Sequence, residues 1–207
     1  MQIDSYVVHI VDDEEAARKS LAFLLTTMGF TVRVHPSAAS FLAAVPEIGR
    51  ACLVTDLRMP DLSGVELLER LNAAGATVPA IVVTGQGDVP IAVAAMKAGA
   101  VDFIEKPFED HLLVDAIKRA ANRLDRTEAT DDDATLRVRL DLLSERERQV
   151  LSAVVAGMPN KAIAYDLDIS PRTVEVHRAN VMAKMQARNL PDLVRMAIVL
   201  GLAARHG

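Results

Sequence analysis

The chain has 207 residues, of which 51% are hydrophobic and 25% are charged, so it can bury one large core or two small ones. Aromatic residues make up only 3% and Trp is absent, which argues against modules that stack unpaired bases on exposed rings. A single cysteine, Cys52, excludes a disulfide framework and a cysteine-based zinc site. The sequence has no secretory signal pattern and no apolar run of membrane-spanning length, so we expect a cytoplasmic protein without a membrane partner.

The net charge of −5 is unevenly distributed along the chain. Residues 1–120 carry a net charge of −6, whereas residues 136–207 carry +4. An acidic first part and a basic last part favour two domains with separate roles, the second of which is suited to phosphate backbones. We therefore expect a first domain over residues 1–124, a linker over 125–138 and a second domain over 139–207. The apolar periodicity fades over residues 122–134, and the neighbouring like charges of Asp131-Asp132-Asp133 disfavour a packed core. We expect a helical extension that runs into a short exposed hinge, with a plain solvated tether as the alternative.

The first 120 residues alternate short apolar segments with amphipathic ones. The expected strands cover residues 6–11, 31–35, 51–55, 80–83 and 101–105. The expected helices cover residues 14–28, 37–44, 64–71, 89–98 and 109–124. Because the strands are almost continuously apolar, the pattern predicts an α/β fold, a flavodoxin-like doubly wound sheet of five parallel strands covered on both faces.

Polar side chains stand where these strands end, which is the edge at which parallel sheets bind ligands. They are Asp12, Asp13, Asp56, Thr84 and Lys106. Three neighbouring carboxylates repel one another, so the group needs a cation, and all-oxygen ligands suit Mg²⁺ (or Mn²⁺). A magnesium ion beside a carboxylate and a lysine is what phosphoryl transfer requires. Asp56 is the natural nucleophile, because a carboxylate can accept a phosphoryl group as a mixed anhydride.

Each of these residues also has an ordinary structural explanation. Asp12 or Asp13 can cap the helix that starts near Glu14, and Thr84 can be a turn residue. Lys106 alone is most often a solvated charge. Their joint placement at successive strand ends is what favours a functional site.

Residues 5–124 resemble the receiver domains of response regulators. The resemblance is carried by Val11-Asp12-Asp13, by Asp56-Leu57-Arg58-Met59-Pro60-Asp61, by Thr84-Gly85 and by Lys106-Pro107-Phe108. It implies that Asp56 is the phosphorylated residue and that Thr84 and Lys106 bind the phosphoryl oxygens. It also implies direct metal ligation by Asp13 and Asp56, with Asp12 acting through water and the backbone carbonyl of Arg58 completing the shell.

The same resemblance implies a conformational switch and a cis peptide bond between Lys106 and Pro107. Thr84 would move toward the phosphoryl group, and Phe103 would rotate into the space behind it, although ordinary core packing is the alternative for this ring. Two phosphorylated receivers would then pair through the 89–105 face. The residues suggested for that face are Ile91, Val93, Met96, Lys97, Asp102 and Glu105.

The last part of the chain carries the signals of several short helices. Ser144 and Glu147 match a capping box, and Ser170 followed by Pro171 is a strong helix start. The expected helices cover residues 144–157, 160–167, 171–185 and 191–200. Two helices joined by a short turn, the second with exposed polar residues, predict a helix-turn-helix, although the polar stripe alone also suits an ordinary charged helix.

Residues 141–200 resemble the LuxR/NarL-type helix-turn-helix family. The matching residues include Leu143-Ser144-Glu145-Arg146-Glu147, Asn160-Lys161, Ile169-Ser170, Thr173-Val174, His177 and Lys184-Met185. The resemblance makes 171–185 the recognition helix and places Glu175, Val176 and Ala179 at the base-reading positions. The residues suggested for contacts with DNA phosphates are Lys161, Arg172, Thr173, Arg178 and Lys184, and Asn160 is also suggested for DNA binding. Many members carry a basic residue where this chain has Glu175, which accepts from cytosine rather than binding guanine.

Together the two parts resemble response regulators that control nitrogen-fixation genes. The resemblance implies an oxygen-sensing histidine kinase as partner, activation of transcription with RNA polymerase at duplex promoter DNA, and a homodimer when phosphorylated. It implies no enzyme activity beyond self-phosphorylation and slow self-dephosphorylation. An aspartate-nucleophile phosphatase is the enzymatic alternative, but Arg58 stands where its acid/base carboxylate is needed. An RNA-binding antiterminator is the other alternative, and the chain lacks an aromatic platform for unpaired bases.

Overall fold

The computed structural model describes residues 6–85, 87–125 and 133–203. They form two compact units, one built around a parallel sheet and the other built from helices. In these three ranges no helix is both long enough and apolar enough to span a bilayer.

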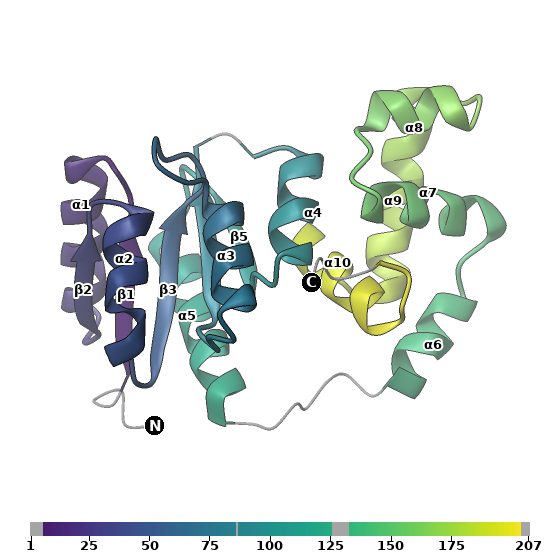
Figure 1. Cartoon of the computed structure of the whole chain (residues 1–207). Coiled ribbons are helices and arrows are strands. Elements are labelled where there is room, and N and C mark those ends of the chain that lie inside the picture. The colour runs from purple at the N-terminus through teal and green to yellow at the C-terminus, as the bar shows by residue number, and fades with distance from the viewer. Residues whose placement is uncertain (1–5, 86, 126–132, 204–207) are drawn as a thin grey trace. The chain divides into compact units, whose positions relative to one another are not determined.

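The first unit contains five parallel strands in the order β2-β1-β3-β4-β5, as predicted (Figure 1). The strands are β1 (Val7–Val11), β2 (Thr31–His35), β3 (Ala51–Asp56), β4 (Ala80–Thr84) and β5 (Asp102–Glu105). In the register, Val11 lies opposite Thr55 and Thr84 lies opposite Glu105. The residues that follow β1, β3 and β5 are therefore brought to one edge of the sheet.

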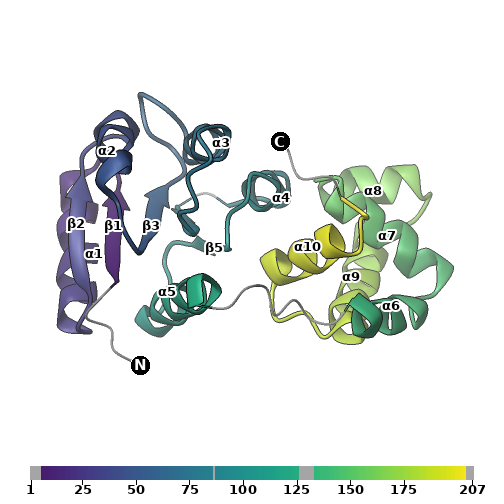
Figure 2. The same ribbon diagram turned by 60° about the horizontal axis from the view of Figure 1, so that its bottom comes forward.

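Helices cover both faces of this sheet (Figures 1 and 2). They are α1 (Glu15–Thr27), α2 (Ala38–Ala44), α3 (Gly64–Ala73) and α5 (Asp110–Asp125), with a short 3-10 helix at Val45–Glu47. Leu25 of α1 and Ile117 of α5 share one aliphatic core with Ile10 and Val54 of the sheet. The opposite face is covered by α2 and α3, which bury Phe41 and Leu67. The apolar strands are thus sandwiched, as expected for a parallel sheet.

Helix α4 (Val89–Lys97) connects β4 to β5. Within the face suggested for receiver pairing, Asp102 is buried rather than exposed. Asp102 forms a short ion pair with Arg119 of α5 inside the first unit. A buried carboxylate is stable when it has such a partner, so this residue is not free to contact a second copy.

Two histidines, buried His9 and half-buried His35, pair between β1 and β2. Nδ1 of His9 lies 2.9 Å from Nε2 of His35, and the two rings are stacked with centroids 5.1 Å apart. Phe41 of α2 packs edge-on against both rings. One nitrogen must donate and the other accept, so this hydrogen bond requires at least one neutral ring. Burial, followed by the charges of His35 and Arg33, lowers the pKa of His9 to about 4.

Over residues 133–203 the second unit contains five helices, α6 (Asp133–Asp141), α7 (Glu145–Val155), α8 (Asn160–Asp166), α9 (Pro171–Met185) and α10 (Leu190–Val199). Its core is aliphatic and includes Leu136, Leu151, Val181, Met185 and Leu193. The capping box and the start of α9 are where the sequence predicts them.

Helix α6 was not predicted, and it overlaps the proposed linker, 125–138. The acidic run was interpreted as a sign of an exposed hinge. Asp133 instead lies in the first turn of α6, where the helix dipole favours a carboxylate, and pairs with Arg137 at 3.0 Å. Leu136 is buried in the core of the second unit, so this unit begins earlier than the suggested residue 139. The remainder of the suggested hinge, 126–132, lies outside the described residues.

Glu147 joins the start of α7 to the end of α9. Its Oε2 accepts the backbone N–H of Ser144 at 2.7 Å and the ammonium group of Lys184 at 2.7 Å. The bond from Lys184, followed by the one from the Ser144 backbone, lowers the pKa of Glu147 to about 2. This carboxylate is buried at 4% exposure, so its two partners replace the water that it loses.

We predict that the first unit loses stability when the pH falls from about 6.5 to about 4. The folded state holds His9 neutral with a pKa of about 4, against an ordinary value of 6.5, so the unfolded chain takes up the proton first. The stabilisation is complete above pH 6.5 and disappears on acidification. Urea unfolding at pH 7.5 and pH 5.0 measures the difference, which His9→Leu should reduce. His111→Gln changes an exposed histidine of α5 and serves as the control; an unchanged pH dependence in His9→Leu would contradict the prediction.

We also predict that Glu147→Gln destabilises the second unit by about 1–3 kcal/mol, because Gln retains the cap but leaves Lys184 without its charge partner. In the wild type this contribution is present above about pH 4.5 and is lost as the pH falls toward about 2, the pKa of Glu147. Hydrogen exchange of the α7 amides at pH 7 measures the change and should be faster in the variant. Glu145→Gln, on the exposed side of the same turn, is the matched control. Equal exchange in both variants would show that the ion pair contributes nothing.

Candidate phosphoryl site and DNA-binding surface

Lys106 connects two carboxylates at the carboxyl edge of the sheet. Its ammonium group lies 3.2 Å from Oδ2 of Asp12 and 3.1 Å from Oδ1 of Asp56. The three side chains come from the ends of β1, β3 and β5, so sheet register alone brings them together. Asp12 is buried, whereas Asp56 keeps 13% of its side-chain surface exposed. The carboxylate in the middle of the sheet is therefore held in place and still reachable from solvent.

The charges at this edge reinforce one another. Burial by itself lowers the pKa of Lys106. The charge of Asp12 and the hydrogen bond and charge of Asp56 raise the pKa by more than burial lowers it. The net effect is a pKa above the ordinary value, so Lys106 stays an ammonium ion. A fixed positive charge beside a carboxylate is suited to an incoming anion with several oxygens.

Asp12 combines the structural role and the site role that its position suggests. Its Oδ1 accepts the backbone N–H of Glu14 at 2.9 Å at the start of α1, while its Oδ2 binds Lys106. Asp13 is exposed beside it. Across residues 6–85, 87–125 and 133–203, no three His, Cys, Asp or Glu side chains are grouped closely enough to hold a metal ion. Lys106 relieves the repulsion between Asp12 and Asp56, and Asp13 lies exposed beside this pair.

The main chain after Asp56 is packed tightly against its carboxylate. The backbone N–H of Arg58 donates to Oδ2 of Asp56 at 2.6 Å. Gly64, the first residue of α3, lies so close that an added Cβ would be 2.6 Å from the carbonyl oxygen of Asp56. No other residue fits without moving this backbone. Gly64 is thus a site residue that sequence reasoning missed.

The two residues suggested for the conformational switch lie on neighbouring strands, Thr84 at the end of β4 and Phe103 within β5. Thr84 ends β4 and is buried, and its carbonyl accepts the N–H of Lys106 at 2.7 Å. Phe103 is half-buried in β5, and its ring edge would be 3.0 Å from a Cβ at Gly87. The Lys106-Pro107 peptide bond is cis, as predicted.

Two further residues support the site through contacts with no local sequence signal. Arg18 of α1 donates to the carbonyl oxygen of Asp12 at 2.6 Å. Asp61 accepts the N–H of Ala39 at 3.0 Å, which ties the loop after β3 to the start of α2. That backbone hydrogen bond is the main reason why the pKa of Asp61 is lowered.

The second unit presents a helix-turn-helix made of α8, a short turn and α9. Asp168 turns the chain with a positive φ of 53°, a conformation that Asp tolerates better than most residues. Ser170 then caps α9 by accepting the N–H of Thr173 at 3.0 Å. Val174, Val181 and Met185 are buried on one stripe of α9, as predicted.

The nine residues suggested for DNA binding fall into two groups. Five are exposed, namely Lys161, Arg172, Glu175, Val176 and Ala179. Among the others, Arg178 donates to Oδ1 of Asn160 at 2.6 Å, and Lys184 is paired with Glu147. Thr173 is half-buried, with its hydroxyl 2.8 Å from that of Ser170. His177 is half-buried too, and its Nδ1 has no hydrogen-bond partner among the described residues.

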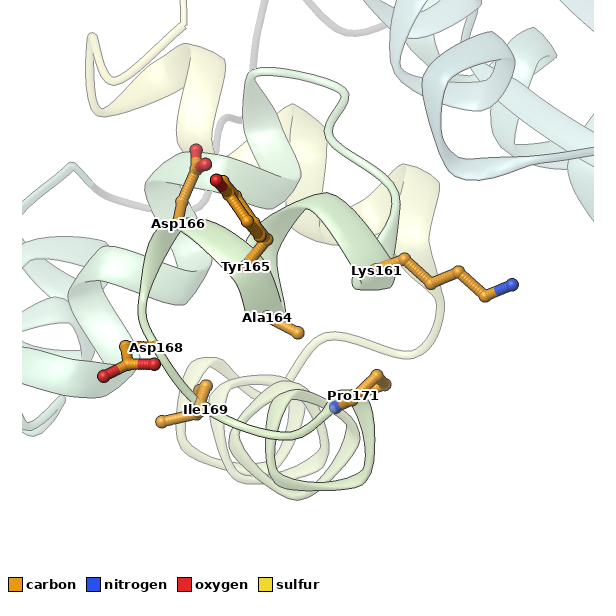
Figure 3. A pocket seen from close by; sticks show the side chains of 7 residues that line it. All are labelled: Lys161, Ala164, Tyr165, Asp166, Asp168, Ile169 and Pro171. Carbon is orange, nitrogen blue, oxygen red and sulfur yellow. The ribbon is translucent and has the colours of Figure 1, made fainter.

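An open hollow lies between α8 and the start of α9 (Figure 3). Its lining residues are Lys161, Ala164, Tyr165, Asp166, Asp168, Ile169 and Pro171. Tyr165 is 87% exposed, the largest value among the exposed large hydrophobic side chains described. This hollow was not predicted from the sequence.

Two family models match the chain. The response regulator receiver domain matches residues 8–118, and the LuxR family of bacterial regulatory proteins matches residues 141–197. The first match covers the sheet with the Asp12–Asp56–Lys106 contacts, and the second covers the helix-turn-helix.

Known proteins resemble the chain over nearly its whole length. It is 68% identical to the transcriptional regulatory protein FixJ of Rhizobium meliloti (strain 1021), over 95% of this chain and 97% of that protein. It is 49% identical to FixJ of Bradyrhizobium diazoefficiens, over 94% and 96% of the two chains. The crystal structure of full-length FixJ from B. japonicum matches with a TM-score of 0.55 at 48% identity, covering 95% of this chain and 97% of that one. The chain therefore belongs to the FixJ transcriptional regulators, response regulators that join a receiver domain to a LuxR-type DNA-binding domain.

Proposed function

We propose that this protein is a transcriptional activator controlled by phosphorylation of Asp56. The observation that carries the proposal is the pair of contacts from Lys106 to Asp12 and Asp56 at the edge of the sheet. They provide a partly exposed carboxylate as acceptor and a fixed cation for the oxygens that arrive with the phosphoryl group. The phosphoryl donor in this proposal is the phosphohistidine of a FixL-like, oxygen-sensing sensor kinase, as the resemblance to nitrogen-fixation response regulators implies.

In the transfer step, a carboxylate oxygen of Asp56 forms a bond to phosphorus while the bond between phosphorus and the histidine nitrogen of the kinase breaks. The electron pair of the broken bond returns to the imidazole. Lys106 then exchanges its contact with the carboxylate for one with the phosphoryl oxygens, and Thr84 donates its hydroxyl to another of them. The part of the Asp56 side chain that remains exposed is accessible to the donor without opening the sheet.

The oxygen donors at this edge fit Mg²⁺ (or Mn²⁺), since carboxylates and carbonyls are the ligands that these ions prefer. Asp12, Asp13, Asp56 and the backbone carbonyl of Arg58 would hold it. When bound, the ion supplies charge neutralisation for the phosphoryl oxygens. Asp13 is exposed beside the contacts of Lys106, so its carboxylate is free to turn toward a cation.

Phosphorylation adds a charge of roughly −1.5 to −2 beside Lys106 and Thr84. The inward movement of Thr84 leaves space for the half-buried ring of Phe103, and the 89–105 face then pairs two receivers. Pairing places two α9 helices on successive half-sites of duplex promoter DNA, about one helical turn apart. RNA polymerase is the further partner, and microaerobic or nitrogen-fixation promoters are the targets.

We expect a small phosphodonor with Mg²⁺ to raise the affinity of the wild type for its promoter roughly 5- to 150-fold, and to leave Asp56→Asn unchanged. The amide of Asn has no nucleophilic oxygen of comparable charge, so residue 56 cannot be phosphorylated in this variant. Gel-shift titrations with acetyl phosphate measure both. Asp115→Asn, an exposed carboxylate of α5, is the control and should behave as the wild type. A phosphodonor response in Asp56→Asn would exclude Asp56 as the acceptor.

The exposed residues of α9 lead to separate predictions for the affinity and the sequence specificity of DNA binding. Arg172→Ala should weaken binding to all sequences and reduce the salt dependence by about one phosphate contact. Glu175→Ala should instead relax discrimination at one base pair by about 1–3 kcal/mol, because Glu accepts from cytosine. Binding to a library of single base-pair changes at two salt concentrations separates the two effects. If Glu175→Ala weakened all sequences equally, the proposed base contact would be wrong.

A further inference from the structure

The second unit exposes its one aromatic residue instead of burying it. Among residues 133–203, Tyr165 is the only Phe, Tyr or Trp, and its side chain is 87% exposed. The core of the unit is filled by aliphatic residues, so Tyr165 adds nothing to it. A lone exposed aromatic is common on protein surfaces, and its surroundings decide whether it marks an interface.

The surroundings of Tyr165 have the features of a docking surface. It stands beside the hollow between α8 and α9, whose floor includes Ala164, Ile169 and Pro171 (Figure 3). Tyrosine provides a large contact area with little loss of conformational freedom, and it is enriched at the centres of interfaces. An apolar floor with a rigid ring beside it suits an inserted side chain of a partner.

The charges around the hollow identify the partner's chemistry. Asp166 and Asp168 are both exposed at the hollow, and Lys161 is the one cation in its lining. The lining is therefore net negative, although residues 136–207 carry +4. Asp166 and Asp168 lie on the opposite side of the hollow from Lys161 (Figure 3). Carboxylates repel the phosphates of DNA, so the side with these two aspartates is unsuited to a nucleic acid, whereas Lys161 remains suggested for DNA contact. A protein segment that carries Lys or Arg fits it through charge complementarity.

From these observations we infer that the hollow beside Tyr165 docks a basic segment of a protein that is bound to the same promoter DNA. The inference rests on the proposed function, since α8 and α9 must already lie on duplex DNA. Because α8 leads directly into the recognition helix, a partner held there occupies the neighbouring stretch of promoter. RNA polymerase, the partner named in the proposed function, satisfies this requirement because it occupies promoter DNA.

The test uses the phosphorylated full-length protein, promoter DNA and purified RNA polymerase holoenzyme as the probe. The variants are Tyr165→Ala and the double change Asp166→Asn with Asp168→Asn. Asn180→Ala, an exposed residue of α9 outside the hollow, is the control. Tyr165 is exposed and outside the core, so its removal should leave the fold intact. Gel shifts measure DNA binding alone, and the supershift with polymerase measures recruitment.

We expect both variants to bind DNA within about twofold of the wild type and to lose polymerase recruitment by roughly tenfold or more, a change of about 1.4 kcal/mol. Recruitment equal to the wild type in both variants would overturn the inference. An equal loss of DNA binding would also overturn it, because the surface would then be a DNA contact. If the wild type itself fails to bind DNA when phosphorylated, the proposed function fails first, and the binding measurement without polymerase reveals this.

Discussion

Two carboxylates held on one ammonium group determine how the first unit is organised. Asp12 and Asp56 repel each other at the edge of the sheet, and Lys106 makes their approach favourable by lying within 3.2 Å of both. The three residues are separated by 44 and 50 positions in the chain, so only the parallel register of β1, β3 and β5 unites them. The sheet thus positions the charges of these three residues. Any new negative charge on Asp56 acts first on the ion pairs that Lys106 forms with Asp12 and Asp56. Thr84 is linked to these ion pairs because its carbonyl holds the backbone of Lys106.

The second unit uses part of its charge for its own structure. Asp192 is buried, and burial alone would raise its pKa, but hydrogen bonds from Arg188 and Arg195 lower the pKa to about 2. The ammonium group of Lys184 likewise pairs with the buried carboxylate of Glu147 and lowers its pKa. The net positive charge of residues 136–207 therefore differs from the positive charge that is available to contact DNA. Paired arginines and lysines remain in the sum but are committed to carboxylates of the fold.

Sequence reasoning was most successful where the physical signal was local. The strand ends, the capping box at Ser144 and the Ser170-Pro171 helix start each follow from a few neighbouring residues, and the structure has all of them. Helix α6 was missed because its acidic start was interpreted as repulsion, whereas one carboxylate in a first turn is stabilised by the helix dipole. Gly64, Arg18 and Asp61 were missed for another reason: their partners lie elsewhere in the chain and are fixed by tertiary packing. The internal ion pair of Lys184 belongs to the same class, since its partner is 37 residues away.

The internal pairing also gives a physical reason for the proposed control by dimerisation. With Arg178 bound to Asn160 and Lys184 bound to Glu147, the exposed cations suggested for DNA contact are Lys161 and Arg172. The logarithm of the affinity for duplex DNA falls with the logarithm of the salt concentration, with a slope of about 0.9 for each neutralised phosphate. Two phosphate contacts therefore provide little affinity. A pair of such units doubles the contacts and makes the second binding event intramolecular. In the proposed mechanism, weak binding by one copy is therefore useful, because it leaves the occupancy of the promoter to the proposed pairing step that phosphorylation of Asp56 would control.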